Sequence, residues 1–298
     1  MRNVIVTGAN GFIGSELIRR LVNERVNVIA LDVSFASSKL PESEYIQKIE
    51  IGLDDLEKLQ ASIPTGEYDA MYHFAWQGVN GPDKGNPLIQ LKNIQMTMNC
   101  ALAAKAFGCK KFLCAGTIAE RATESLPHLK TVSGGMMYGT AKYSARIMLE
   151  TFCKNVGLDF VWMQFSNIYG PNNKTGNLVS YTIGELLKEK EATFGPALQP
   201  YDFIFIDDLI EAVFRLGKNQ TKQNSYFIGS GNPRILKEYL LEIGQLCGRQ
   251  DLIKIGVRPD DGIVYTFDMF DCTALKQDIG NYVSKDFTNG IRYTLENY

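Results

Sequence analysis

The chain has 298 residues, 45% of them hydrophobic, which is enough to bury a sizeable core in one large or two moderate domains. Its 31 Lys and Arg against 33 Asp and Glu give a formal net charge of -2, which excludes the basic field that nucleic acid binding needs. The apolar start is too short for a signal peptide and no apolar run could span a membrane, so we expect a cytoplasmic protein without a membrane partner.

Cysteine and histidine usage narrows the chemistry further. The six cysteines form no CxxC pair and lie mostly in apolar segments, as free thiols of a reducing compartment do. Neither of the two histidines stands at metal-binding spacing from a Cys or a carboxylate. We therefore predict no metal site and no Ser-His-Asp hydrolase.

Short β-branched runs alternate with longer helical patterns along the first half of the chain. The predicted strands are residues 3–7, 27–31, 70–74, 111–115 and 159–164, and the predicted helices are residues 13–23, 54–62, 88–107 and one that begins near residue 138. This rhythm predicts an α/β fold with a Rossmann doubly wound parallel sheet. Because Val4-Ile5-Val6 is continuously apolar, the first strand should lie inside the sheet.

The pattern changes after Tyr169-Gly170-Pro171. A helix near 178–189 and a short strand at 203–206 follow, in a smaller mixed α/β portion. We predict a dinucleotide-binding Rossmann domain over residues 1–168 and mainly a C-terminal substrate-binding lobe over 169–298, with some segments returning to the Rossmann domain and a cleft between the two.

Spaced glycines join the first strand to the first helix. Gly8, Gly11 and Gly14 have the context of the dinucleotide fingerprint, in which glycines allow a tight turn, approach of a pyrophosphate to the backbone, and close packing of helix on strand. The alternative is a simple turn. The predicted cofactor contacts in this loop are Gly8, Asn10, Gly11, Phe12, Ile13 and Gly14.

An acidic residue follows at the distance that the fingerprint requires. Asp32 ends the second strand, 18 positions after Gly14, where a carboxylate accepts hydrogen bonds from a ribose diol and repels a 2′-phosphate. NAD(H) is therefore favoured, and NADP(H) stays possible. Asp54 could reach the adenine amino group or could instead cap the helix that follows it.

Tyr138 and Lys142, at positions i and i+4, would share one helix face. An ammonium beside a phenol stabilises the phenolate, so we expect Lys142 to lower the pKa of Tyr138 and to make it a proton donor and acceptor. Alternatively, Tyr138 is a core residue and Lys142 its solvated neighbour.

The ordered motifs resemble those of the extended short-chain dehydrogenase/reductase family, of the NAD-dependent epimerase/dehydratase type. They are the glycine loop, His73-Phe74-Ala75, Tyr138-x-x-x-Lys142, Asn167-Ile168-Tyr169-Gly170-Pro171, the run from Asp202 to Asp208, and Arg258-Pro259-x-Asp261. The chain is most similar to the nucleotide-sugar branch with CDP-abequose synthases and dTDP-4-keto-6-deoxyhexose reductases.

The resemblance implies roles for individual residues. Thr117, Tyr138 and Lys142 would be catalytic, with Thr117 holding the reacting sugar oxygen and Lys142 also holding the nicotinamide ribose. Phe74 and Ala75 would contact the cofactor. The implied substrate contacts are Trp76, Thr117, Asn167, Leu178, Phe194, Tyr201 and Arg258, although Trp76 could equally serve packing. The family also implies a homodimer formed by the helices at 88–107 and 138–155.

Departures from the family pattern limit the reaction. Ile118 and Ala119 follow Thr117 where 4,6-dehydratases carry Asp-Glu, and Glu120 is one position out of place. Gln164 and Tyr201 replace arginines that are common in relatives, which puts one phosphate contact in doubt. The leading hypothesis is NAD(P)H-dependent reduction of a nucleotide-linked 4-keto(-6-deoxy)hexose at C4, for a surface polysaccharide or glycoconjugate. The alternatives are a UDP-glucose/galactose-type 4-epimerase and, more remotely, a noncatalytic dinucleotide-binding regulator.

Overall fold

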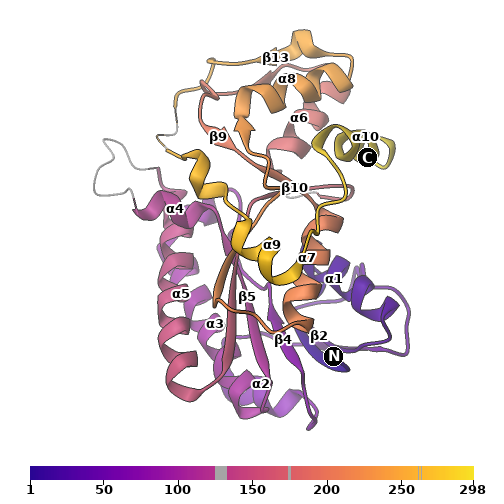
Figure 1. The fold of residues 1–298 in the computed structure, drawn as a ribbon, viewed down its shortest axis with the longest axis vertical. Coiled ribbons are helices and arrows are strands. Elements are labelled where there is room, and N and C mark those ends of the chain that lie inside the picture. Colours follow the sequence, from indigo (N-terminus) through magenta and orange to yellow (C-terminus); the bar gives the residue numbers. More distant parts are fainter. Residues whose placement is uncertain (125–132, 174–175, 261, 263) are drawn as a thin grey trace.

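A seven-stranded parallel sheet forms the centre of the molecule (Figure 1). The computed structural model describes residues 1–124, 133–173, 176–260, 262 and 264–298, so Asp261 lies outside the described residues. The strand order is β11-β6-β5-β4-β1-β2-β3. These strands are β1 (Asn3–Thr7), β2 (Asn27–Asp32), β3 (Ile46–Glu50), β4 (Ala70–His73), β5 (Lys111–Thr117), β6 (Asp159–Phe165) and β11 (Ser225–Ile228). The predicted doubly wound sheet is confirmed, with β1 inside it between β4 and β2.

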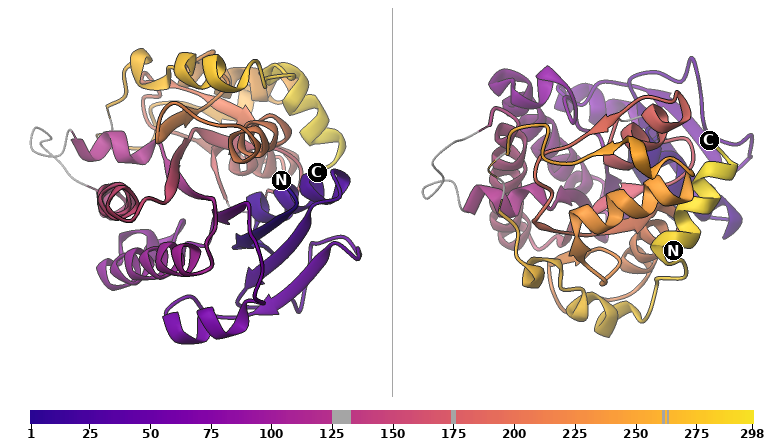
Figure 2. Two further views of the ribbon diagram at one scale, coloured as in Figure 1. Left: turned by 60° about the horizontal axis from the view of Figure 1, so that its bottom comes forward. Right: turned by 90° about the horizontal axis from the view of Figure 1, so that it is seen from above.

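Helices cover both faces of this sheet (Figure 2). Val4 and Val6 point into one core cluster, and Ile5 between them points into the other, because side chains alternate along a strand. On the first face lie α1 (Phe12–Asn23) and α7 (Ile206–Lys218), and on the second lie α2 (Leu56–Ser62), α3 (Pro87–Ala106) and α5 (Met136–Val156). Burial on both faces is what makes the run Val4-Ile5-Val6 continuously apolar.

A smaller lobe stands over the carboxyl ends of the strands (Figure 1). It contains the strand pairs β7 (Asn167–Tyr169) with β10 (Phe203–Phe205), β8 (Ala192–Thr193) with β13 (Ile253–Lys254), and β9 (Pro200–Tyr201) with β12 (Arg234–Ile235), and the helices α6 (Leu178–Leu187), α8 (Leu236–Leu246) and α10 (Phe287–Glu296). From the same half of the chain, β11 joins the main sheet, and α9 (Thr273–Ile279) contacts β11 and α7. Within the described ranges, none of the helices combines the length and the apolar character that crossing a membrane requires.

The sequence prediction missed β3 and β11. β3 is an edge strand with exposed Gln47 and Lys48, so it lacks the apolar run by which the other strands are recognised. Boundaries differ by a few residues elsewhere. The helix predicted from residue 54 begins at Leu56, because Asp55 caps it by accepting a hydrogen bond from the Lys58 N–H at 3.1 Å. Asp54 is therefore not the capping residue.

Candidate active site

A cleft of about 680 Å³ opens at the carboxyl edge of the main sheet, beneath the lobe. This is the edge at which doubly wound sheets bind their ligands. The predicted site residues that line it are Gly8, Gly11, Phe12, Ile13, Gly14, Asp32, Asp54, Phe74, Ala75, Trp76, Thr117, Tyr138, Lys142, Asn167 and Leu178. The remaining ones, Asn10, Phe194, Tyr201 and Arg258, lie outside this lining. The fold thus gathers most of the predicted residues around one space.

Close packing of the backbone requires the glycines of this loop, and the first residues of α1 line the cleft. Gly8 has φ +66°, and a Cβ there would lie 2.7 Å from the Ala75 nitrogen. A Cβ on Gly14 would overlap the Gly8 carbonyl oxygen. The N-cap of α1 is Gly11, whose side chain cannot satisfy the first amides of the helix. These amides face the cleft as the positive end of a helix, which suits a pyrophosphate. The residues present therefore fit a dinucleotide.

Asp32 is held in place by the loop itself. Its Oδ2 accepts a hydrogen bond from the Asn10 N–H at 2.9 Å, and its Oδ1 accepts one from the Val33 N–H at 2.8 Å. Each carboxylate oxygen keeps a further acceptor site, which a ribose diol can use. Asn10 acts from outside the lining, since its side-chain oxygen accepts from the Lys39 N–H at 2.9 Å and so ties the loops together.

Asp54 forms an ion pair across the cleft wall with Lys92, whose Nζ lies 3.0 Å from Oδ2. The hydrogen bond from Lys92 lowers the pKa of Asp54 below its ordinary value. Both residues line the cleft. Their pairing could not be predicted from the sequence, because Lys92 belongs to α3, which lies far along the chain from Asp54.

Tyr138, Thr117 and Lys142 meet at one end of the cleft. Tyr138 and Thr117 both line this end, and the Thr117 side chain lies close enough to affect the pKa of the Tyr138 hydroxyl. The Lys142 Nζ, almost fully buried, donates to the Ala115 carbonyl oxygen at 2.6 Å and lies 3.7 Å from the centre of the Trp76 ring. Burial lowers the pKa of Lys142 to about 8, although Cys114 and Glu120 act in the opposite direction.

The pKa of Tyr138 departs from the sequence prediction. It is raised above its ordinary value, first because burial penalises the phenolate. The Thr117 side chain lowers the pKa, while the Glu120 carboxylate raises it. The expected lowering by Lys142 is thus wrong for the protein without ligands, since burial is a tertiary effect that the spacing of Tyr138 and Lys142 does not report.

Glu120 is the residue of this region that sequence reasoning missed. It lies in α4 (Ala119–Glu124), is fully buried, and accepts hydrogen bonds from the Thr117 N–H at 2.7 Å, Trp162 Nε1 at 3.0 Å and Gln164 Nε2 at 3.0 Å. Burial raises the pKa of the Glu120 carboxyl above its ordinary range, while these three hydrogen bonds and the charge of Lys142 act in the opposite direction and favour the carboxylate. In sequence Glu120 resembles any surface acid in a short helix, so no local signal marks it.

The predicted substrate residues fall into an inner and an outer set. Trp76 packs edge to face against Tyr138, with ring centroids 6.1 Å apart, and its Nε1 donates to Gln90 at 2.8 Å. Asn167 lines the cleft and accepts a hydrogen bond from the Tyr201 hydroxyl at 2.9 Å. Leu178 belongs to the same inner set.

The outer set lies farther into the lobe. Arg258 is exposed, and its guanidinium donates to Thr193 Oγ1 at 2.8 Å and to the Tyr181 hydroxyl at 2.7 Å. Phe194 is buried against the ring of Tyr181. Neither Arg258 nor Phe194 is part of the cleft lining.

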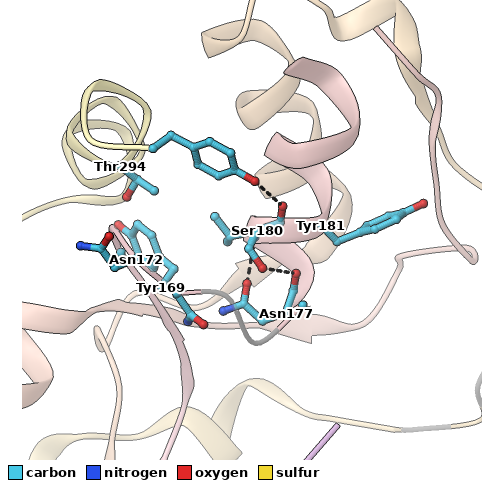
Figure 3. Close-up of a pocket in the computed structure, with 11 residues that line it drawn as sticks. Tyr169, Asn172, Asn177, Ser180, Tyr181 and Thr294 are labelled. Atoms are coloured by element: carbon cyan, nitrogen blue, oxygen red, sulfur yellow. Dashed lines mark hydrogen bonds between the residues drawn. The ribbon is translucent and has the colours of Figure 1, made fainter. Parts of the chain in front are cut away.

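A second pocket of about 390 Å³ adjoins the cleft (Figure 3). Asn173 and Asn177 line both spaces, and the amides of both donate to the Ile168 carbonyl oxygen. Figure 3 shows Tyr169 and Thr294 facing this pocket and Tyr181 directed away from it. Asn173 and Asn177, which precede the predicted substrate contact Leu178 along the chain, therefore face two cavities.

The fold and the cleft define a dinucleotide-binding protein of the doubly wound class. Residues 4–229 match the model of the NAD dependent epimerase/dehydratase family, and the chain belongs to that family. It is therefore an NAD-dependent enzyme, as the resemblance implied. The narrower similarity to CDP-abequose synthases stays a prediction.

Individual relatives agree with this assignment. The UDP-glucose 4-epimerase of Mycolicibacterium smegmatis is 25% identical over 264 residues, which cover 83% of each chain. UDP-glucuronic acid decarboxylase 6 of Arabidopsis thaliana is 29% identical over 72% of this chain and 65% of its own length. The structure of the UDP-glucose 4-epimerase of Thermotoga maritima, solved with UDP-glucose, shares the fold with a TM-score of 0.83, at 22% identity over 99% of this chain and 97% of the other.

Proposed function

We propose that this enzyme reduces the C4 carbonyl of a nucleotide-linked 4-keto(-6-deoxy)hexose, in the synthesis of a sugar for a surface polysaccharide or glycoconjugate. The observation that carries the proposal is the cluster of Thr117, Tyr138 and Lys142 at the end of a cleft whose other end is the glycine loop. NADH is the favoured reductant because the Asp32 carboxylate would repel a 2′-phosphate.

The residues divide the acid-base work between them. When bound, the reduced cofactor supplies a hydride to the carbonyl carbon. The Thr117 hydroxyl holds the carbonyl oxygen, and the Tyr138 hydroxyl donates its proton to that oxygen. The Lys142 ammonium, with a pKa of about 8, is charged at neutral pH and stabilises the phenolate that remains on Tyr138. Solvent then returns a proton to Tyr138.

Two features bear on which reaction of the family is proposed. The raised pKa of Tyr138 favours the phenol, which is the form that a proton donor needs. Ile118 and Ala119 offer no acid or base where dehydratases carry one, and the Glu120 carboxylate is fully engaged by hydrogen bonds inside the protein. A 4,6-elimination of water therefore lacks its catalytic groups.

A nucleotide-sugar 4-epimerase is the second candidate. It would use the same cluster, with Tyr138 taking the proton of the sugar C4 hydroxyl and later returning it, and a retained NAD would supply the hydride acceptor and donor. The similarity to two UDP-glucose 4-epimerases supports it.

The discriminating experiment incubates the purified enzyme with NADH or NADPH and a panel of sugars. The panel holds 4-keto-6-deoxyhexoses on different nucleotides together with UDP-glucose, UDP-galactose and UDP-glucuronic acid. Reduced-nicotinamide absorbance and the sugar products, identified by NMR, are followed together. One cofactor oxidised per sugar reduced supports the reductase, whereas interconverted sugars without net oxidation support the epimerase. Loss of carbon dioxide from UDP-glucuronic acid, or no reaction at all, would contradict both.

The substrate contacts belong to this proposal as well. Trp76, Asn167 and Leu178 would border the sugar, and Phe194, Tyr201 and Arg258 would support or contact the nucleotide from the lobe. The guanidinium of Arg258 suits phosphate oxygens.

The enzyme is also proposed to act as a cytoplasmic homodimer. Leu88 and Leu91 of α3 are 75% and 61% exposed, and Ile147 and Met148 of α5 are 45% and 48% exposed, so the two adjacent helices offer an apolar face to a second copy. All six cysteines are free thiols, as in proteins of a reducing compartment. Sedimentation of Leu91→Glu as a monomer beside a wild-type dimer would support this interface, and a monomeric wild type would contradict it.

A further inference from the structure

Glu120 is a buried carboxylate beside the acid-base cluster, and the proposed reaction gives it no direct step. Its hydrogen bonds connect the end of β5, through the Thr117 N–H, to β6, through Trp162 and Gln164. Thr117 and Tyr138 line the same end of the cleft, so the hydrogen bond from the Thr117 N–H links Glu120 to the residue beside Tyr138. The carboxylate thus fixes the backbone of the residue that holds the reacting oxygen.

Glycines make room for this arrangement. A Cβ on Gly116 would lie 2.7 Å from Glu120 Oε1 and would overlap Trp162 Nε1. A Cβ on Gly139 would overlap the Ala119 carbonyl oxygen, so this glycine lets α5 approach α4. The close approach brings the helix that carries Tyr138 and Lys142 against the helix that carries Glu120.

Glu120 also carries a charge opposite to that of the buried Lys142 ammonium. Its hydrogen-bond donors are neutral groups, and the buried positive charge that acts on it is Lys142 of α5. A buried ammonium is costly unless an opposite charge compensates it. The other groups that face this region are Tyr138 of α5, Cys114 of β5, His73 of β4, which the charge of Lys142 also affects, and Arg121 of α4, whose guanidinium donates to Gln164 Oε1 at 3.1 Å.

The electrostatic effects of Glu120 on its two neighbours have the same direction. Its negative charge raises the pKa of Lys142, against the larger lowering by burial, and adds to the raised pKa of Tyr138. Both groups are thereby kept protonated.

We propose that Glu120 is a positioning residue that fixes Thr117 against Tyr138 and, as a buried counter-charge, holds Tyr138 and Lys142 in the protonated state from which ketone reduction starts. The catalytic consequence rests on the proposed function, whereas the effect on Lys142 does not. Loss of this charge would favour the phenolate and the neutral amine. An enzyme that begins by oxidising an alcohol would not benefit from such a carboxylate.

The test uses Glu120→Gln, which keeps nearly the same shape and removes the charge. Titration of the full-length enzyme labelled with ¹³C at lysine Cε, with the Lys142 signal assigned by its absence in Lys142→Arg, needs no sugar. We expect the Lys142 midpoint to fall by about one pH unit in Glu120→Gln. The alkaline limb of the pH profile for ketone reduction should shift to lower pH by a similar amount.

Gln164→Met is the matched control, because it removes a hydrogen bond to the same carboxylate and keeps the charge. It should lower the melting temperature and leave the Lys142 midpoint in place. A folded Glu120→Gln with an unchanged Lys142 midpoint would overturn the proposal, and so would an equal shift in Gln164→Met.

Glu120→Asp decides the matter if Glu120→Gln does not fold. It retains the charge but withdraws it from the Thr117 N–H, so the Lys142 midpoint should hold while kcat for reduction falls about 10- to 100-fold at similar KM. The proposed role of Glu120 would be contradicted if Glu120→Asp lowered the Lys142 midpoint as much as loss of the charge is expected to, or if it left kcat unchanged. Failure of the whole sugar panel would reject the proposed function and leave the lysine titration intact as a test.

Discussion

The carboxyl edge of the main sheet and the lobe above it are built in different ways. At the sheet edge the ligand-facing groups are backbone turns and nearly buried side chains, such as Gly8 and Lys142, fixed by strands whose both faces are covered. In the lobe the strands are only two or three residues long, and Arg258 is exposed on a loop. Chemistry at the edge requires fixed distances, whereas recognition by loops tolerates variation. Substitutions at the edge should therefore affect turnover and stability, and substitutions in the lobe should affect substrate affinity.

The largest effect is expected at the edge, from Tyr138→Phe. Removing the hydroxyl leaves the carbonyl oxygen without its proton donor, so kcat should fall by about 10²- to 10⁴-fold. Cofactor affinity, measured by quenching or transfer of fluorescence, should be retained. Tyr143→Phe on the same helix is the control, since Tyr143 is outside the lining of the cleft. Unchanged turnover in Tyr138→Phe would remove Tyr138 from the mechanism.

Gly14→Ala should act on the cofactor end of the same edge. The added methyl group would overlap the Gly8 carbonyl oxygen, and neither backbone segment can move without disturbing the loop. We expect the free energy of unfolding to fall by about 2–3 kcal/mol and NADH affinity to fall more than about 10-fold. Gly66→Ala, at an exposed turn where the nearest atom would be 3.7 Å away, should change neither. Equal denaturation curves for Gly14→Ala and the wild type would show that the loop is not tightly packed.

The sequence reports these edge features because they are local. Three glycines within one turn, and Tyr138 and Lys142 within one helix, are each fixed by neighbours along the chain, so their spacing predicts their geometry. The same holds for the apolar strands of the sheet interior.

What the sequence did not report depends on contacts between distant segments. Glu120 becomes a buried hydrogen-bond acceptor only when β6 brings Trp162 beside it, 42 positions along the chain. The sign of the pKa shift on Tyr138 depends on burial, which no i, i+4 spacing encodes. The edge strand β3 escaped prediction because one-sided burial leaves it with a polar composition.

Lowering the pH should lower the free energy of unfolding because His73 is buried at the sheet edge in its neutral form. This buried side chain bridges Thr7, at 2.7 Å from Nδ1, and Thr97, at 3.0 Å from Nε2, and burial lowers its pKa to about 3. Between pH 3 and an ordinary histidine pKa of about 6.5, the unfolded chain binds a proton that the folded protein excludes. The contribution of neutral His73 to the free energy of unfolding is thus complete above about pH 6.5. It is lost as the pH falls below that value, at up to about 1.4 kcal/mol per pH unit.

Urea unfolding at several pH values checks this expectation. His73→Gln removes the titrating group, so its stability should fall less steeply than that of the wild type between pH 6.5 and 4.5. Parallel slopes for the two proteins would assign acid sensitivity to carboxylates elsewhere.

The smallest effect is expected from a substitution in the lobe. It tests whether the lobe affects substrate affinity without affecting turnover. Arg258→Ala removes an exposed guanidinium that is hydrogen-bonded to Thr193 and Tyr181 in the lobe. If it contacts the nucleotide as proposed, its loss should raise KM for the nucleotide sugar about 10-fold and leave kcat and NADH affinity unchanged. Arg249→Ala, which removes an arginine paired with Glu189 in the same lobe, should leave KM unchanged and so exclude a general loss of positive charge. A fall in kcat comparable to that of Tyr138→Phe would mean that the lobe also fixes the reacting groups. The division between an edge that performs the chemistry and a lobe that selects the substrate would then fail, because a single exposed loop residue would control the distances at the sheet edge.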